Sequence, residues 1–151
     1  MLGWSRNEKH LGDIQCFSGK QGLVDIAKQT DILICLLPLT KATHQLINGE
    51  FLHCLPKGAC LINFARGGVI ADDDLLNCLD NGQLAYAVLD VFDQEPLSKQ
   101  SHYWLHEKVM VLPHISAPTH LLSASKIVAE NIKNYRATGL LPPCIDLNLG
   151  Y

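Results

Sequence analysis

DILICLLP (residues 31–38) is an almost uninterrupted apolar run that stops at a proline. Three similar runs follow it along the chain: ACLINF (59–64), AYAVLDV (85–91) and VMVL (109–112). Short runs that are apolar on both faces are typical of strands in parallel sheets covered by helices. We also interpret residues 1–4 as the end of one further strand.

Helical patterns separate these runs. They cover residues 21–29, 49–55, 71–79 and about 118–138. In the last helix one face carries an apolar stripe, made of Leu121, Ala124, Val128, Ile132 and Tyr135. Asn81-Gly82 and Gly139 are typical helix stops. Alternating strands and helices predict an α/β fold with a doubly wound parallel sheet.

Composition narrows the class of protein. The 151 residues suit one domain, with 48% hydrophobic and 18% charged residues. A net charge of −3 gives no reason to expect binding to nucleic acid or to an anionic membrane. No apolar run reaches the roughly 20 residues of a membrane helix, and no signal peptide pattern opens the chain. None of the six cysteines belongs to a C-x-x-C pair, and Cys35 and Cys60 lie inside apolar runs, so we expect reduced thiols and a cytoplasmic protein. We expect no metal site.

Polar residues follow the carboxyl ends of the predicted strands, and this is the edge at which parallel sheets bind their ligands. Arg66 follows one strand, Asp90 and Glu95 follow the next, and His114 follows the last. Reduction of a 2-keto acid needs a guanidinium for the carboxylate, a histidine as proton donor and a carboxylate that orients the histidine. Arg66, His114 and Glu95 fit these roles, although each one taken singly is more often structural.

Four segments resemble successive signatures of the D-isomer-specific 2-hydroxyacid dehydrogenases. They are LLPLTKATHQLIN (36–48), LPKGACLINFARGGVIADDDLL (55–76), LDVFDQEPL (89–97) and LPHISAPT (112–119). The chain is most similar to the glyoxylate/hydroxypyruvate reductase branch, including its terminal Gly150-Tyr151. The resemblance implies that Arg66 binds the substrate carboxylate, that His114 is the acid–base catalyst and that Glu95 pairs with it.

The same resemblance implies contacts to a nicotinamide cofactor. Leu37 and Pro38 match the loop beside the cofactor ribose. The carbonyl of Ala65 and the carboxylate of Asp90 match groups that meet the nicotinamide amide.

The resemblance also places Ser5 and Arg6 at the end of the second strand of a Rossmann unit. A basic residue at this point suits the 2′-phosphate of NADP, whereas an acidic one suits NAD. Ser5 and Arg6 therefore favour NADP, and nearby Glu8 keeps NAD as the alternative.

The chain departs from the family because it contains no G-x-G-x-x-G phosphate loop. We therefore expect residues 1–139 to form a partial dinucleotide-binding domain that lacks its first strand and helix. That central strand's absence should split the sheet or expose two strand edges. Residues 140–151 are expected to be a tail that returns to a substrate domain.

The leading functional hypothesis is an oxidoreductase that uses NADP(H) to reduce glyoxylate or hydroxypyruvate. Its partners would be a small 2-keto acid and further copies of the same chain in a homo-oligomer. Two alternatives remain from the sequence: an inactive truncated remnant, and a dinucleotide-sensing binding module of the same fold.

Overall fold

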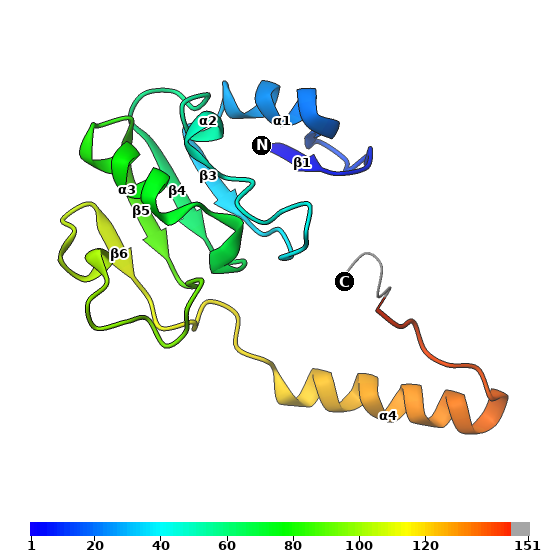
Figure 1. The fold of residues 1–151 in the computed structure, drawn as a ribbon. Coiled ribbons are helices and arrows are strands. Elements are labelled where there is room, and N and C mark those ends of the chain that lie inside the picture. The colour runs from blue at the N-terminus through cyan, green and yellow to red at the C-terminus, as the bar shows by residue number, and fades with distance from the viewer. Residues whose placement is uncertain (146–151) are drawn as a thin grey trace. The chain divides into compact units, whose positions relative to one another are not determined.

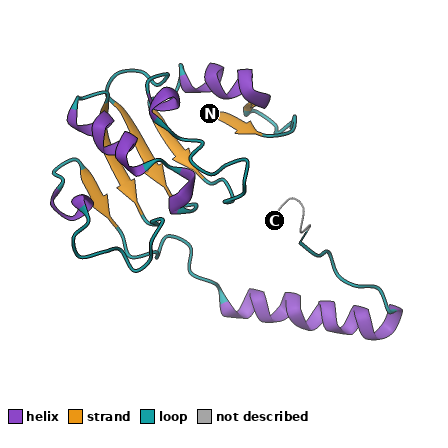
Figure 2. Ribbon diagram, viewed as in Figure 1, coloured by secondary structure: helices purple, strands orange, loops and turns teal. Residues whose placement is uncertain are grey.

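The computed structural model describes residues 1–145, and contacts divide the chain into two compact units, Met1–His114 and Ile115–Tyr151. The first unit contains six strands (Figures 1 and 2): β1 (Leu2–Ser5), β2 (Gln15–Ser18), β3 (Ile32–Cys35), β4 (Ala59–Asn63), β5 (Leu84–Leu89) and β6 (Val109–Val111). Its helices are α1 (Gly19–Ala27), α2 (Gly49–Leu52) and α3 (Asp72–Asp80), with short 3-10 helices η1 (Gly67–Val69) and η2 (His102–Leu105). The second unit contains α4 (Leu121–Thr138).

All strand pairs are parallel, and they form two separate sheets. One sheet has the order β3-β4-β5-β6, and the other pairs β1 with β2. The predicted α/β fold is confirmed, and of the two expected outcomes for the sheet, splitting or two exposed edges, the structure shows the splitting. Strand β2 was not predicted, because its four residues, QCFS, form no apolar run.

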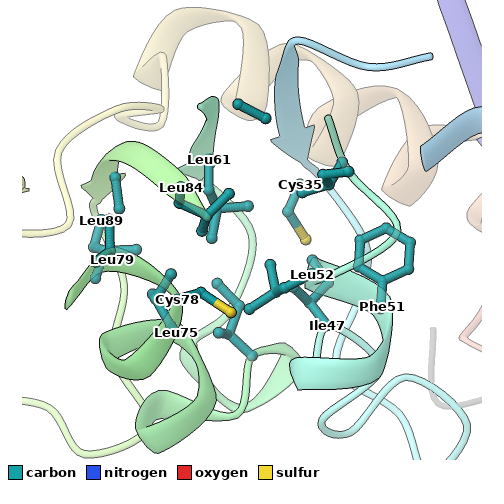
Figure 3. Close-up of a cluster of buried hydrophobic side chains, with 14 of the residues drawn as sticks. Cys35, Ile47, Phe51, Leu52, Leu61, Leu75, Cys78, Leu79, Leu84 and Leu89 are labelled. Atoms are coloured by element: carbon teal, nitrogen blue, oxygen red, sulfur yellow. The ribbon is translucent and has the colours of Figure 1, made fainter. Parts of the chain in front are cut away.

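The core lies between the four-stranded sheet and helices α2 and α3, which cover the same face of the sheet (Figures 1 and 3). Leu61 and Leu84 reach it from the strands, Leu52 from α2, and Leu75 and Leu79 from α3, and all five are fully buried. Three aspartates open α3, as predicted, where the helix dipole favours negative charge.

The opposite face of this sheet is apolar and partly open. Ile34, Ile62, Val88 and Met110 stand side by side across the four strands. Ile34 and Met110 are 52% and 48% exposed, and Ile32 on the same face of β3 is 61% exposed. The sequence predicted helices over both faces, and this face differs because no helix of unit 1–114 buries it.

We expect this open face to make residues 1–151 self-associate. Ile32→Thr and Ile34→Thr should each lower the association constant about tenfold. Each removes apolar surface equal to roughly two methylene groups, at about 0.8 kcal/mol per methylene. Concentration-dependent light scattering measures the effect. Leu105→Thr is the control, since Leu105 is 92% exposed but lies on η2, outside the sheet. Equal loss in the control would contradict the assignment.

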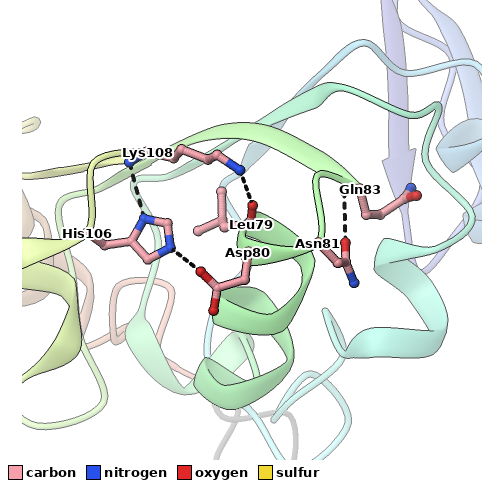
Figure 4. A network of polar contacts seen from close by, with 6 residues as sticks. All are labelled: Leu79, Asp80, Asn81, Gln83, His106 and Lys108. Atoms are coloured by element: carbon pink, nitrogen blue, oxygen red, sulfur yellow. Dashed lines mark hydrogen bonds and ion pairs between the residues drawn. The ribbon is translucent and has the colours of Figure 1, made fainter.

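Polar contacts tie the end of α3 to the start of β6 (Figure 4). The Lys108 ammonium donates to the Leu79 carbonyl, and His106 Nε2 lies 3.2 Å from Asp80 Oδ1. The Gln83 amide donates to Asn81 Oδ1 just beyond the helix. Helix α3 therefore ends at Asp80, and the predicted stop at Asn81-Gly82 is confirmed.

Helix α4 begins three residues after the predicted start, with His120 as its N-cap. It ends before Gly139, whose φ of +70° is the left-handed conformation that glycine adopts without strain. Of the residues of α4, all of which are described, none is buried, and the apolar residues of the predicted stripe are not covered within their own unit. Among the described helices, none combines the length and apolar character needed to cross a bilayer.

Candidate active site

The candidate site residues follow the carboxyl ends of the parallel strands. Ala65 and Arg66 follow β4, and Asp90 follows β5 directly. His114 lies three residues beyond β6. Because the strands run parallel, these positions meet at one edge of the four-stranded sheet.

A buried asparagine shapes the turn that presents Arg66. Asn63, at the end of β4, is fully buried, and its Nδ2 donates to the Arg66 carbonyl over 3.0 Å. Its Oδ1 accepts the Ala65 amide N–H, also over 3.0 Å. Since a buried amide is costly unless both of its ends are bonded, Asn63 holds this turn in one conformation.

Glu95 and His114 form the hydrogen-bonded pair that the sequence predicted. His114 Nδ1 lies 2.9 Å from Glu95 Oε2, and the Phe92 amide N–H donates to Glu95 Oε1 over 3.0 Å. His114 has a φ of +54°, a conformation that is uncommon for a residue with a side chain and concentrates at functional sites. With Nδ1 directed at Glu95, Nε2 on the other side of the half-exposed ring is the nitrogen available to a ligand.

The charge state of Glu95 follows from these contacts. The Phe92 N–H, together with the hydrogen bond from His114, holds the pKa of Glu95 below its ordinary value of 4.5. The positive charge of Arg66 also lowers this pKa, whereas partial burial opposes the shift. The structure thus pairs Glu95 with His114 directly, and Arg66 lies near enough to add a smaller electrostatic contribution.

This lowered pKa predicts an acid-dependent contribution to stability. A depressed folded pKa stabilises the fold above the unfolded value near 4.5, and the gain is lost as the pH falls through the folded pKa. Because Glu95 is more than a third exposed, the contribution should be at most about 1 kcal/mol. Urea unfolding between pH 6 and 3 should show Glu95→Gln less stable than wild type only at the higher pH. Glu107→Gln, at an exposed residue before β6, serves as the control. A difference independent of pH would contradict the prediction.

The predicted cofactor contacts are distributed over four strand ends of the first unit, three of them in the four-stranded sheet. Asp90 is buried, and its amide N–H donates to the Asn63 carbonyl. The Ala65 carbonyl accepts a hydrogen bond from the Arg66 guanidinium over 2.6 Å. Leu37 is half-buried beyond β3, next to the exposed Pro38.

Ser5 is the last residue of β1, and Arg6 follows it directly. The Ser5 hydroxyl donates to the Asn7 carbonyl over 2.6 Å, and Arg6 is exposed.

Sequence reasoning missed two residues that hold the site in place: Asn63 and Phe92. Asn63 could have been found, since it is the single polar residue in the run ACLINF. Phe92 acts through its backbone N–H, which residue types and spacing do not reveal.

Comparison with known proteins agrees with this geometry. The family model for the D-isomer specific 2-hydroxyacid dehydrogenase, NAD binding domain, matches residues 1–116. A D-isomer specific 2-hydroxyacid dehydrogenase from Xanthobacter autotrophicus Py2, solved with NADPH and MES, is 37% identical with a TM-score of 0.94. That match covers 99% of this chain and 62% of the Xanthobacter chain.

A second relative is an NADPH-dependent glyoxylate/hydroxypyruvate reductase from Sinorhizobium meliloti, solved with NADP and sulfate. It is 33% identical with a TM-score of 0.92, and the match covers 99% of this chain and 49% of the reductase. The chain thus spans between about half and about three fifths of the length of these relatives. With the parallel fold, the site geometry and the family match in agreement, this chain belongs to the D-isomer-specific 2-hydroxyacid dehydrogenases.

Proposed function

We propose that residues 1–151 carry the catalytic half of a reductase that uses NADP(H) to convert glyoxylate or hydroxypyruvate to the 2-hydroxy acid. The observation that carries the proposal is the 2.9 Å contact between His114 and Glu95 beside the Arg66 turn. The Sinorhizobium relative supports the substrate class, because it is a reductase of these two acids.

Each site residue has one chemical task. Arg66 binds the substrate carboxylate through the paired donors of its planar guanidinium. His114 gives the proton on Nε2 to the carbonyl oxygen as negative charge develops there. Glu95 accepts a hydrogen bond from Nδ1–H, which orients the imidazole and stabilises its protonated form. When bound, the reduced nicotinamide supplies the hydride.

The residues present fit the two ends of the cofactor. Asp90 and the Ala65 carbonyl place hydrogen-bond acceptors at adjacent strand ends, which suits a carboxamide. Arg6 at the end of β1 suits the 2′-phosphate of NADP and, with Ser5, favours NADP over NAD. Leu37 and Pro38 would pass beside the ribose.

We extend the proposal to the domain arrangement. Residues 1–139 form part of a dinucleotide-binding domain, and the tail from Leu140 returns to a substrate domain in a homo-oligomer. Leu140, Leu141 and Ile145 are each at least two-thirds exposed, as expected for a segment that packs elsewhere. The Gly150-Tyr151 ending lies outside the described residues.

A chimera tests the function directly. Residues 1–151 replace the part of the Sinorhizobium reductase that they match, and oxidation of NADPH is followed at 340 nm with glyoxylate, hydroxypyruvate or pyruvate. Turnover with the first two acids supports the proposal. A folded chimera that binds NADPH but reduces none of them contradicts it.

The proposed role of Arg6 gives a cofactor prediction. Arg6→Ala in the chimera should raise the KM for NADPH about tenfold, since a charge-assisted contact to phosphate is worth roughly 1.5 kcal/mol. The KM for NADH should stay nearly unchanged, because NADH lacks the 2′-phosphate. Lys9→Ala, which removes a nearby exposed charge, is the control. Equal effects of Arg6→Ala on both cofactors would show that Arg6 does not contact the phosphate.

A further inference from the structure

Gly67, which follows Arg66, lies against the backbone of another segment of the chain. A Cβ added at Gly67 would fall 1.8 Å from the Phe92 carbonyl carbon and 2.1 Å from the Asp93 nitrogen. Real Cβ atoms essentially never approach another atom closer than 3.0 Å, so a side chain would force these backbones apart by more than 1 Å. The contact is therefore possible only with glycine at this position.

Site residues lie on both sides of this contact. On one side, Asn63 fixes the Ala65–Arg66 turn through its two amide hydrogen bonds, and its own carbonyl accepts the Asp90 N–H. On the other side, the Phe92 N–H holds one carboxylate oxygen of Glu95, while the second oxygen contacts His114. An unbroken series of contacts thus leads from the guanidinium-bearing turn to the imidazole.

We propose that Gly67 is a positioning residue, which sets the spacing between Arg66 and the Glu95–His114 pair by seating the Arg66 turn on the Phe92–Asp93 backbone. The inference rests on the proposed function. A 2-keto acid carries its carboxylate and its carbonyl on adjacent carbons, so the cation and the proton donor must keep one fixed separation. Misplacement of reacting groups by about 1 Å can cost about 10²-fold in rate.

The neighbouring glycine offers a matched control. A Cβ at Gly68 would meet Asp93 Oδ1 at 2.8 Å and Leu39 Cδ2 at 3.2 Å, which are ends of flexible side chains that can move. Both glycines are buried and belong to η1. Gly67→Ala and Gly68→Ala therefore differ chiefly in whether backbone must shift.

The first experiment uses residues 1–151 themselves. Hydrogen exchange of the Phe92 amide, whose N–H is bonded to Glu95, should speed up at least tenfold in Gly67→Ala and stay within about twofold in Gly68→Ala. Amides of Leu61 and Leu89 in the core strands report whether each variant is folded. Unchanged Phe92 exchange in a folded Gly67→Ala overturns the proposal.

The second experiment measures kinetics in the chimera. Gly67→Ala should lower kcat/KM for the keto acid about 10²-fold, with NADPH binding within twofold, and Gly68→Ala should change either quantity little.

Should Gly67→Ala not fold, Asn63→Asp replaces it, since it keeps the acceptor for Ala65 and loses the donor to the Arg66 carbonyl. A raised keto-acid KM with normal NADPH binding then supports positioning of the turn, and an unchanged KM overturns it. If the wild-type chimera is inactive, the proposed function fails, and the exchange experiment still decides the role of Gly67.

Discussion

Replacing His114 by alanine is expected to lower kcat of the chimera about 10²–10⁴-fold, the usual contribution of a general acid. NADPH binding should stay within about twofold, because His114 contacts Glu95 and acts on the substrate oxygen rather than on the cofactor phosphates. Stopped-flow reduction of glyoxylate and fluorescence titration with NADPH measure the two quantities separately.

A matched variant shows whether the loss of kcat is specific to the histidine of the candidate site. His102→Ala removes an exposed imidazole on η2 and should leave kcat within about twofold. Glu95→Gln should give a smaller loss than His114→Ala, since the imidazole remains but its orienting charge is gone. Near-normal turnover in His114→Ala would rule out the assigned acid.

Residues 1–151 taken alone are expected to show turnover at least about 10⁵-fold below that of the chimera. Holding reactants in attacking geometry supplies roughly 7–11 kcal/mol of barrier lowering, and this chain contributes only some of the groups that hold them. The pyrophosphate normally rests on a glycine-rich helix N-terminus, and the sequence has no G-x-G-x-x-G. Calorimetry with NADPH should accordingly show binding weaker than micromolar.

The comparison requires equal conditions for both proteins. The chimera and residues 1–151 are assayed at the same concentration, with light scattering to correct for self-association. Micromolar NADPH binding together with measurable turnover by residues 1–151 would show that the described strand ends suffice without that loop.

Much of the fold could be predicted because parallel strands and their ligand edges leave strong local signals. The four apolar runs became β3 to β6, and Arg66, Asp90 and His114 fell at their carboxyl ends. The Glu95–His114 hydrogen bond was also predictable, since the motifs that carry both residues follow neighbouring strands. The catalytic and cofactor-binding roles of these residues stay predictions.

Other features depend on tertiary contacts that sequence patterns do not encode. Strand β2 exists because β1 pairs with it, residue by residue from Leu2↔Gln15 to Ser5↔Ser18. The backbone contact at Gly67 depends on how close two loops come, and glycine at that position could equally have served a turn. The exposure of Ile34 follows from the lack of a covering helix within residues 1–114 rather than from its own apolar run.

The divided sheet has a consequence for how the first unit unfolds. Each sheet has its own ladder of backbone hydrogen bonds, and α1 packs on β1 and β2, whereas the buried cluster belongs mainly to the other sheet and its helices. The strand pairing of Leu2–Ala27 is thus separate from that of Ile32–Val111, and only α1, through Leu23 and Ala27, joins the shared buried cluster. We therefore expect the smaller segment to melt first. A single two-state free energy would then not describe residues 1–114, and calorimetric and van't Hoff enthalpies should disagree.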